Sequence, residues 1–105
     1  DLISKVIHEE FEENLTPASL ETLTIIAYRG PISRAQIEYI RGVNSSFILR
    51  SLLMRGLIER FNDPHKPISY LYQVTFDFLK FLGITKIEDL PDFKKYQEID
   101  KINWE

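Results

Sequence analysis

The turn and capping residues between positions 15 and 60 constrain the fold of this chain more than any other sequence feature. Thr16-Pro17 is a typical helix start. Threonine can accept a hydrogen bond from a free N–H of the first turn, and the N–H that proline lacks would have no partner within the helix at this position. Gly30-Pro31 ends this helix and turns the chain. Ser33-Arg34-Ala35-Gln36 is an S-x-x-Q capping box, which predicts the start of a second, short helix. Two helices joined by a tight turn are therefore predicted.

The same kind of punctuation predicts a third helix. Gly42 closes the second helix, and Asn44 or Ser45 can cap the third. That helix runs to Arg55, with Gly56 just beyond it. Three helices joined by short glycine-containing turns are typical of a helix-turn-helix unit, whose third helix lies exposed. Its outer face is therefore a candidate binding surface.

The residues after the third helix predict a hairpin and one more helix. Leu57–Phe61 and Ile68–Val74 are rich in β-branched and aromatic residues and predict two strands. Asn62–Pro67 between them holds the turn formers Asn, Asp and Pro and predicts a loop. Thr75 can then cap a last short helix that ends at Gly83. The side chains expected to point inward from this helix are Phe76, Leu79 and Leu82.

These elements together predict a winged helix-turn-helix, a mainly α fold with a small β-hairpin. The winged-helix domain spans 15–83, a leading or linker helix precedes it at 1–14, and a C-terminal tail follows at 84–105. The leading segment repeats apolar residues at helical spacing, namely Ile3, Ile7 and Phe11. Short helices gain most of their stability by packing, so we expect this segment to dock on the domain, on a preceding neighbour or on a second copy.

Composition argues against several classes of function. The chain has no cysteine, so disulfides and thiolate metal sites are excluded, and His8 and His65 lie far apart in the sequence. No run of about 18 apolar residues predicts a membrane-spanning helix. No glycine-rich phosphate loop, His/Cys nucleophile arrangement or HExxH motif occurs. We therefore expect a protein that is not an enzyme and has no metal, cofactor or membrane partner.

The third predicted helix has two different faces. At about 100° per residue, its core side carries four aliphatic residues, Ile48, Leu49, Leu52 and Leu53. The opposite side carries four residues spaced i, i+3, i+4 and i+7, which are Phe47, Arg50, Ser51 and Met54. A helix that reads DNA carries mostly polar side chains on this face, whereas here half are apolar. The face therefore favours a protein partner, with Phe47 and Met54 as apolar anchors and Arg50 as a charged orienter.

Two other occupants of this face are consistent with the sequence. The leading helix of the same chain could cover Phe47 and Met54, or a nucleic acid could bind if basic side chains face its phosphates. Residues 16–83 carry eight Lys/Arg against five Asp/Glu, a mildly basic balance that permits nucleic acid without requiring it. The residues able to face a phosphate backbone are Arg34, Arg41, Arg50, Arg55, Arg60 and Lys66. A winged-helix DNA-binding transcriptional regulator is therefore the alternative function.

The same region also contains an ordered series of short segments. They are LETL at 20–23, IIAY at 25–28, PISR at 31–34, IEYIRGV at 37–43, LRSL at 49–52 and RGLI at 55–58. This series resembles the second winged-helix domain of segregation and condensation protein B (ScpB). FL at 78–79, FLG at 81–83 and LP at 90–91 extend the resemblance toward the C-terminus. The wing differs, because His65-Lys66-Pro67 stands where the family usually has Gly-Arg-Pro.

The resemblance implies a role in chromosome condensation and segregation. Members of the family are non-catalytic subunits of the prokaryotic, condensin-like SMC complex. They hold tandem winged-helix domains, form homodimers, and bind the kleisin subunit (ScpA-like), through which they reach SMC. By this resemblance the chain would be a cytoplasmic, nucleoid-associated, kleisin-binding protein with weak or indirect DNA contact, and residues 1–14 would lead in from a preceding winged-helix domain. No family contact is carried over to the altered wing, Asn62–Lys66.

Overall fold

Helices α2, α3 and α4 form the first half of the domain. The computed structural model describes residues 15–95, so the predicted leading helix and residues 96–105 of the predicted tail lie outside the described residues. The helix bounds are Pro17–Arg29 for α2, Arg34–Arg41 for α3 and Ser46–Met54 for α4. These are the three helices that the capping and glycine pattern predicts.

The predicted helix starts are confirmed by their hydrogen bonds. Thr16 Oγ1 accepts from the Ser19 N–H at 3.1 Å at the start of α2. Ser33 Oγ accepts from the Gln36 N–H at 3.2 Å, and Gln36 Oε1 accepts in return from the Ser33 N–H at 3.1 Å. Gly42 follows α3 with a φ of 77°, in the left-handed region that glycine adopts without strain. Local side chain–backbone bonds therefore set where α2 and α3 begin.

Three antiparallel strands complete the winged helix-turn-helix. Their bounds are Ile32–Ser33 for β1, Ile58–Asp63 for β2 and Lys66–Val74 for β3. The sheet order is β1-β3-β2, so β3 is central. In β1, Ile32 lies opposite Tyr72 and Ser33 lies opposite Leu71. This strand was not predicted, because two residues, the second of which is the helix cap Ser33, are too few to show a strand alternation.

The hairpin is longer than the sequence predicts. The expected loop Asn62–Pro67 is wrong, because the strands include all of it except Pro64-His65. Asn62 donates from Nδ2 to the Pro67 carbonyl at 2.8 Å, and Asp63 Oδ1 accepts from the His65 N–H at 2.8 Å. The Asn and Asp side chains that favour loops therefore stabilise a tight turn here through bonds to the backbone.

Helix α5 spans Phe76–Phe81 and corrects one predicted orientation. Thr75 caps it as expected, accepting at Oγ1 from the Phe78 N–H at 3.1 Å. Phe76 was expected to point inward but is 56% exposed, whereas Phe78 is 2% exposed. Phe76 lies three residues before Leu79 and Phe78 lies four before Leu82, so helical spacing alone cannot choose between them in so short a helix.

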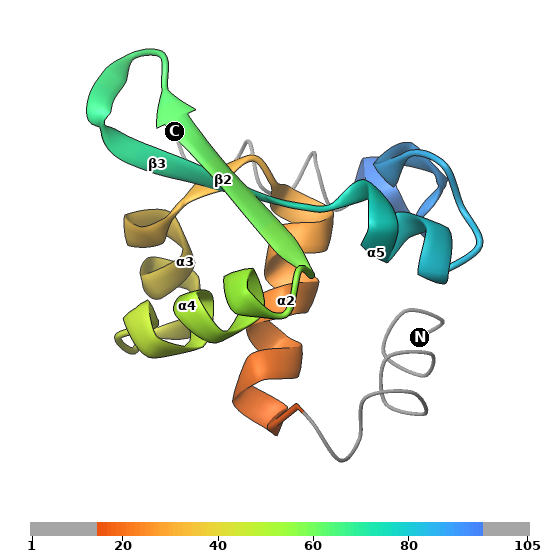
Figure 1. Cartoon of the computed structure of the whole chain (residues 1–105), viewed down its shortest axis with the longest axis horizontal. Helices are drawn as coiled ribbons and strands as arrows, with labels where there is room; N and C mark the ends of the chain where they lie inside the picture. The colour runs from red at the N-terminus through yellow and green to blue at the C-terminus, as the bar shows by residue number, and fades with distance from the viewer. Residues whose placement is uncertain (1–14, 96–105) are drawn as a thin grey trace.

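The core lies between the helices and the sheet. Two of the four residues predicted for the core side of the third helix, Leu49 and Leu52, are buried, together with Leu23, Ile37 and Leu57. The other two, Ile48 and Leu53, are partly buried and pack against this core, as does Leu20. Figure 1 shows α5 and the following 3₁₀ helix η1 (Ile87–Asp89) at one end of the molecule and the β2–β3 hairpin projecting at the other. Leu90, from the predicted tail, is buried in the same core.

Candidate functional site

Helix α4 is positioned by polar contacts from outside the helix. Its N-cap residue, Ser45, makes no side-chain capping bond. Instead the Glu38 carboxylate on α3 accepts from the Ser45 N–H at 2.8 Å, and Asn44 Oδ1 accepts from the Ser46 N–H at 3.0 Å. Two N–H groups at the start of α4 are therefore satisfied by neighbouring side chains. These contacts fix α4 against α3.

Arg41 ties three helices together. Its Nε lies 2.8 Å from Glu21 Oε1 on α2, and its Nη1 donates to Ser45 Oγ at 2.8 Å. The Arg41 side chain is only 7% exposed. We expected Arg41 among the side chains able to face a nucleic acid. The structure corrects this expectation, because the guanidinium is covered and already bonded to the protein.

Arg34 holds a similar but more open position. Its Nη1 donates to Ser46 Oγ at 3.0 Å, and its Nε lies 3.6 Å from Glu38 Oε2. The Arg34 side chain is 55% exposed, in contrast to that of Arg41. It therefore helps to hold the start of α4 and still presents part of its charge to solvent.

The predicted orientation of α4 is confirmed by the burial of its side chains. Leu49 and Leu52 are 2% and 0% exposed, whereas Phe47 and Met54 are 80% and 82% exposed. Single exposed apolar side chains are common on protein surfaces and need no explanation. Here a phenylalanine and a methionine seven residues apart share one helix face, because seven residues make about two turns. This pair is the apolar part of the candidate site.

Phe47 and Met54 border a surface hollow of about 390 Å³ on α4. Its lining residues are Phe47, Arg50, Ser51, Met54 and Arg55. The structure therefore brings together all four predicted partner-binding residues. It adds Arg55, which was predicted only as a residue able to face a phosphate backbone. Arg55 Nε donates to Ser51 Oγ at 3.4 Å. Because this lining holds two cations and no carboxylate, the hollow suits an apolar side chain flanked by acidic groups.

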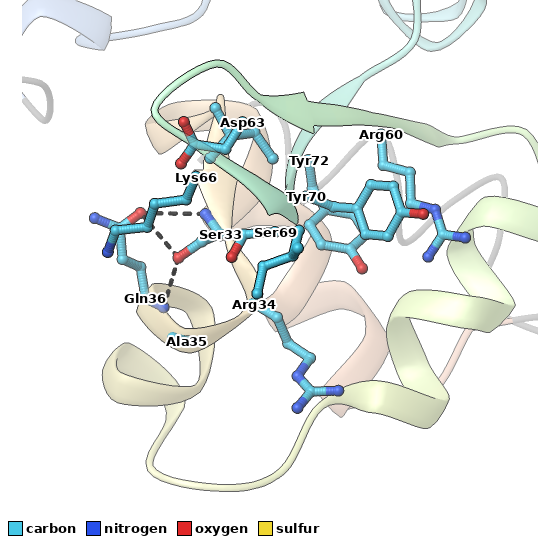
Figure 2. Close-up of a pocket in the computed structure, with 12 residues that line it drawn as sticks. Ser33, Arg34, Ala35, Gln36, Arg60, Asp63, Lys66, Ser69, Tyr70 and Tyr72 are labelled. Carbon is cyan, nitrogen blue, oxygen red and sulfur yellow. Dashed lines mark hydrogen bonds between the residues drawn. The ribbon is translucent and has the colours of Figure 1, made fainter.

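The other predicted basic residues lie near the hairpin. The Arg60 guanidinium lies 4.1 Å from the centre of the Tyr70 ring, and Lys66 is exposed at the start of β3. Together with Arg34 they line a second groove (Figure 2). This groove shares no lining residue with the hollow on α4. Sequence reasoning did not find this groove, because it depends on how the hairpin lies beside the start of α3. No periodic pattern in the sequence marks it.

Comparison with known proteins decides the family. Residues 1–93 match the model of the segregation and condensation complex subunit ScpB. The chain belongs to the ScpB family. It is 43% identical over 102 residues to the segregation and condensation protein B of Clostridioides difficile, an alignment that covers 94% of this chain and 56% of that protein. The chain thus spans about half the length of the curated ScpB relatives it matches.

Solved structures agree with membership of the ScpB family. The crystal structure of ScpB from Mycobacterium tuberculosis is similar with a TM-score of 0.63 and 38% identity, over 79% of this chain and 52% of that chain. MarR is similar with a TM-score of 0.60 and 24% identity, over 96% of this chain and 74% of that chain, a likeness that concerns the fold alone. Across residues 15–95, no helix has the length and apolar character needed to cross a membrane.

Proposed function

We propose that this ScpB-family chain binds the kleisin subunit of the prokaryotic SMC complex through the hollow on α4. Its role is that of a non-catalytic, cytoplasmic and nucleoid-associated subunit in chromosome condensation and segregation, which reaches SMC through the kleisin. In the whole protein, we propose that two copies form a homodimer. The observation that carries the proposal is the exposed pair Phe47 and Met54, displayed on a helix that Glu38 and Arg41 hold in place.

The exposed apolar pair offers a partner a large gain in free energy. Phe47 and Met54 are at least 80% exposed, so nearly all of both side chains is available to a partner. Burying apolar surface contributes about 25 cal/mol per Å². A well-packed aromatic anchor can carry about 2 kcal/mol of binding or more. Two anchors on one helix face suit an amphipathic segment that lies along α4.

The hollow requires little ordering when a partner binds. Leu49 and Leu52 pack α4 on the core, and the Glu38 carboxylate fixes its first turn. A pre-organised site loses less conformational entropy on binding than a mobile one. Arg50 and Arg55 line the hollow and would pair with acidic residues of the kleisin segment. Apolar anchors would then supply affinity, while the arginines would set the direction of the segment.

A DNA-reading regulator fits the same face less well. A helix in the major groove contacts base edges with polar side chains, whereas Phe47 and Met54 offer none. Arg41 is bonded within the protein, and the hairpin cations Arg60 and Lys66 line the separate groove rather than the hollow. These observations favour the kleisin over the DNA duplex as the ligand of the hollow.

Two titrations over a range of salt concentrations separate these functions. One uses the central segment of the kleisin and the other uses duplex DNA. We expect the affinity for the kleisin to change little with salt. The affinity for DNA should be weak and sequence-independent, and the logarithm of its binding constant should fall against the logarithm of the salt concentration with a slope of about 0.9 per phosphate contact. Sequence-selective DNA binding that is lost on Arg50→Ala, together with no affinity for the kleisin segment, would contradict the proposal.

A third titration tests whether the leading segment of the chain covers the hollow. The kleisin titration is repeated with residues 1–14 removed, after the truncated protein has been shown to unfold cooperatively. Unchanged kleisin affinity would mean that the hollow is accessible in the intact chain. A rise of about tenfold or more, equivalent to about 1.4 kcal/mol, would mean instead that residues 1–14 compete with the kleisin.

A further inference from the structure

The groove beside the hairpin is larger than the hollow on α4, at about 650 Å³. It lies between the start of α3 and the half of β3 nearest the turn. The lining residues that matter here are Arg34, Arg60, Asp63, Lys66, Ile68 and Tyr70. In the view of Figure 2, Lys66 and Asp63 lie toward one end of the groove, and Arg60 with Tyr70 lies toward the other. The cations are therefore spread along the groove rather than gathered at one point.

Part of β3 in this groove has no paired residue in either neighbouring strand. β1 pairs only with Leu71-Tyr72. In β2, Asn62 pairs with Tyr70, but the next residue, Asp63, pairs with Lys66, so the register shifts between them. Within the described chain, Pro67–Ser69 therefore have no register partner on either side. Bulges of this kind redirect side chains, and both a bulge and a proline hinder the addition of another strand. A ligand of the groove would thus be recognised mainly by side chains.

The side chains of the groove combine positive charge with exposed apolar surface. Arg60 is stacked on Tyr70 at 4.1 Å, which orients its guanidinium. Lys66 is exposed, and Ile68 is 96% exposed. The one carboxylate of the lining, Asp63, already accepts a backbone N–H of the turn at 2.8 Å. The positive charge of the groove therefore favours an anionic ligand. The exposed side chain of Ile68 favours a ligand that also has apolar groups.

We propose that this groove binds an extended acidic segment of a partner polypeptide, at a site separate from the hollow on α4. Carboxylates of the segment pair with Lys66 at one end and with Arg60 at the other. The planar guanidinium can hold a carboxylate through two parallel N–H groups. Alternate side chains of an extended chain lie on the same side about 7 Å apart. Such a segment can therefore place acidic groups along the groove and cover Ile68 with an apolar side chain between them.

A nucleic-acid backbone fits these observations less well. Phosphates in the groove would leave the exposed Ile68 side chain in water, because a phosphate backbone offers it no apolar contact. Binding to a duplex through its backbone gains affinity from many phosphate contacts, each of which releases counterions. The groove offers Arg60 and Lys66, with Arg34 shared with Glu38 at 3.6 Å. An acidic polypeptide needs fewer cations and uses the apolar surface as well.

The test uses the 105-residue chain and a defined probe peptide. The probe is a capped peptide of about ten residues that repeats Glu-Ser-Val-Ser, so that glutamate and valine alternate along one face of the extended chain, and its control replaces each glutamate with lysine. We expect the glutamate peptide to bind with a Kd of about 0.1 mM or tighter. It should shift the amide resonances of Lys66 and of 68–70 and leave those of α4 in place. The lysine peptide should not bind.

Two charge-reversed proteins provide a matched comparison. Arg60→Glu combined with Lys66→Glu should weaken binding of the glutamate peptide by at least about tenfold. Lys80→Glu combined with Lys86→Glu makes the same change in net charge at the α5 end and should weaken it by less than about twofold. All four side chains are exposed, so unfolding midpoints should remain near that of the unaltered chain. A third variant, Ile68→Ser, should weaken binding by about threefold or more through lost apolar contact.

Several results would overturn this proposal. Equal losses of peptide affinity in the two charge-reversed proteins would mean that the peptide responds to the net charge of the protein and not to the groove. Resonance shifts confined to α4 would place the peptide in the hollow instead. Displacement of the peptide by duplex DNA at physiological salt would indicate a nucleic-acid groove, and a gain in affinity on removal of residues 1–14 would indicate that the chain's own acidic leading segment is the ligand. Failure of the glutamate peptide to bind would also contradict it, without affecting the kleisin titrations on α4.

Discussion

The Glu38 carboxylate accepts a hydrogen bond from the Ser45 N–H at 2.8 Å, so a side chain of α3 caps the first turn of α4. Arg41 supports the same junction by donating to Ser45 Oγ at 2.8 Å. The outer face of α4 carries the proposed partner site. The position of Phe47 and Met54 therefore depends on polar contacts at the turn between the two helices.

Replacement of Glu38 tests this junction. Glu38→Ala removes the acceptor for the Ser45 N–H and should lower the free energy of unfolding by about 1–2 kcal/mol, the usual cost of a lost cap. Glu38→Gln keeps an acceptor oxygen and should cost less than Glu38→Ala. Chemical denaturation monitored by circular dichroism measures both. A loss no larger than that of Glu88→Ala, an exposed carboxylate on η1, would show that Glu38 does not stabilise the start of α4.

Two glycines are expected to respond differently to alanine. A Cβ at Gly30 would lie 2.6 Å from the Ile26 carbonyl oxygen and 3.1 Å from that of Tyr72, so backbone of α2 or β3 must move. A Cβ at Gly42 would meet no atom within 4 Å, and only its φ of 77° is unfavourable. Gly42→Ala should cost about 1 kcal/mol, and Gly30→Ala about 2 kcal/mol or more. Thermal and chemical unfolding should rank them in this order, and the reverse order would contradict the packing of Gly30.

The two faces of α4 predict opposite responses to truncation. Leu52 is fully buried, so Leu52→Ala should lower the free energy of unfolding by about 2–5 kcal/mol. Met54 is 82% exposed, so Met54→Ala should change it by no more than about 0.5 kcal/mol. Equilibrium denaturation of the two variants under identical conditions measures the difference. Similar losses would mean that α4 is rotated relative to the orientation described above.

The helices could be predicted because their ends are marked by local chemistry. Thr16, the Ser33–Gln36 box and Gly42 act on residues within one turn, and a single sequence shows such short-range relationships directly. β1 could not be predicted, because it exists only through pairing with Leu71-Tyr72, about forty positions along the chain. The orientation of Phe76 was missed for a related reason, since only packing distinguishes it from Phe78.

The candidate site was predictable to the extent that it lies on one helix. The helical period separates Phe47 and Met54 from the buried side of α4 without knowledge of any other element. The fate of Arg41 was not predictable in this way, because it depends on Glu21 in a different helix. The groove of Arg60 and Lys66 likewise depends on the path of the hairpin, where the predicted loop was wrong.

The most direct test of the kleisin-binding proposal is the affinity of a double variant of α4 for the kleisin central segment. Phe47→Ala combined with Met54→Ala removes both apolar anchors and should weaken binding by at least about 30-fold, or about 2 kcal/mol. Phe76→Ala, which removes a 56% exposed phenylalanine on α5, should change the affinity by less than about twofold. Both proteins should keep the unfolding midpoint of the unaltered chain. An unchanged kleisin affinity in the folded double variant would contradict the claim that α4 binds the partner.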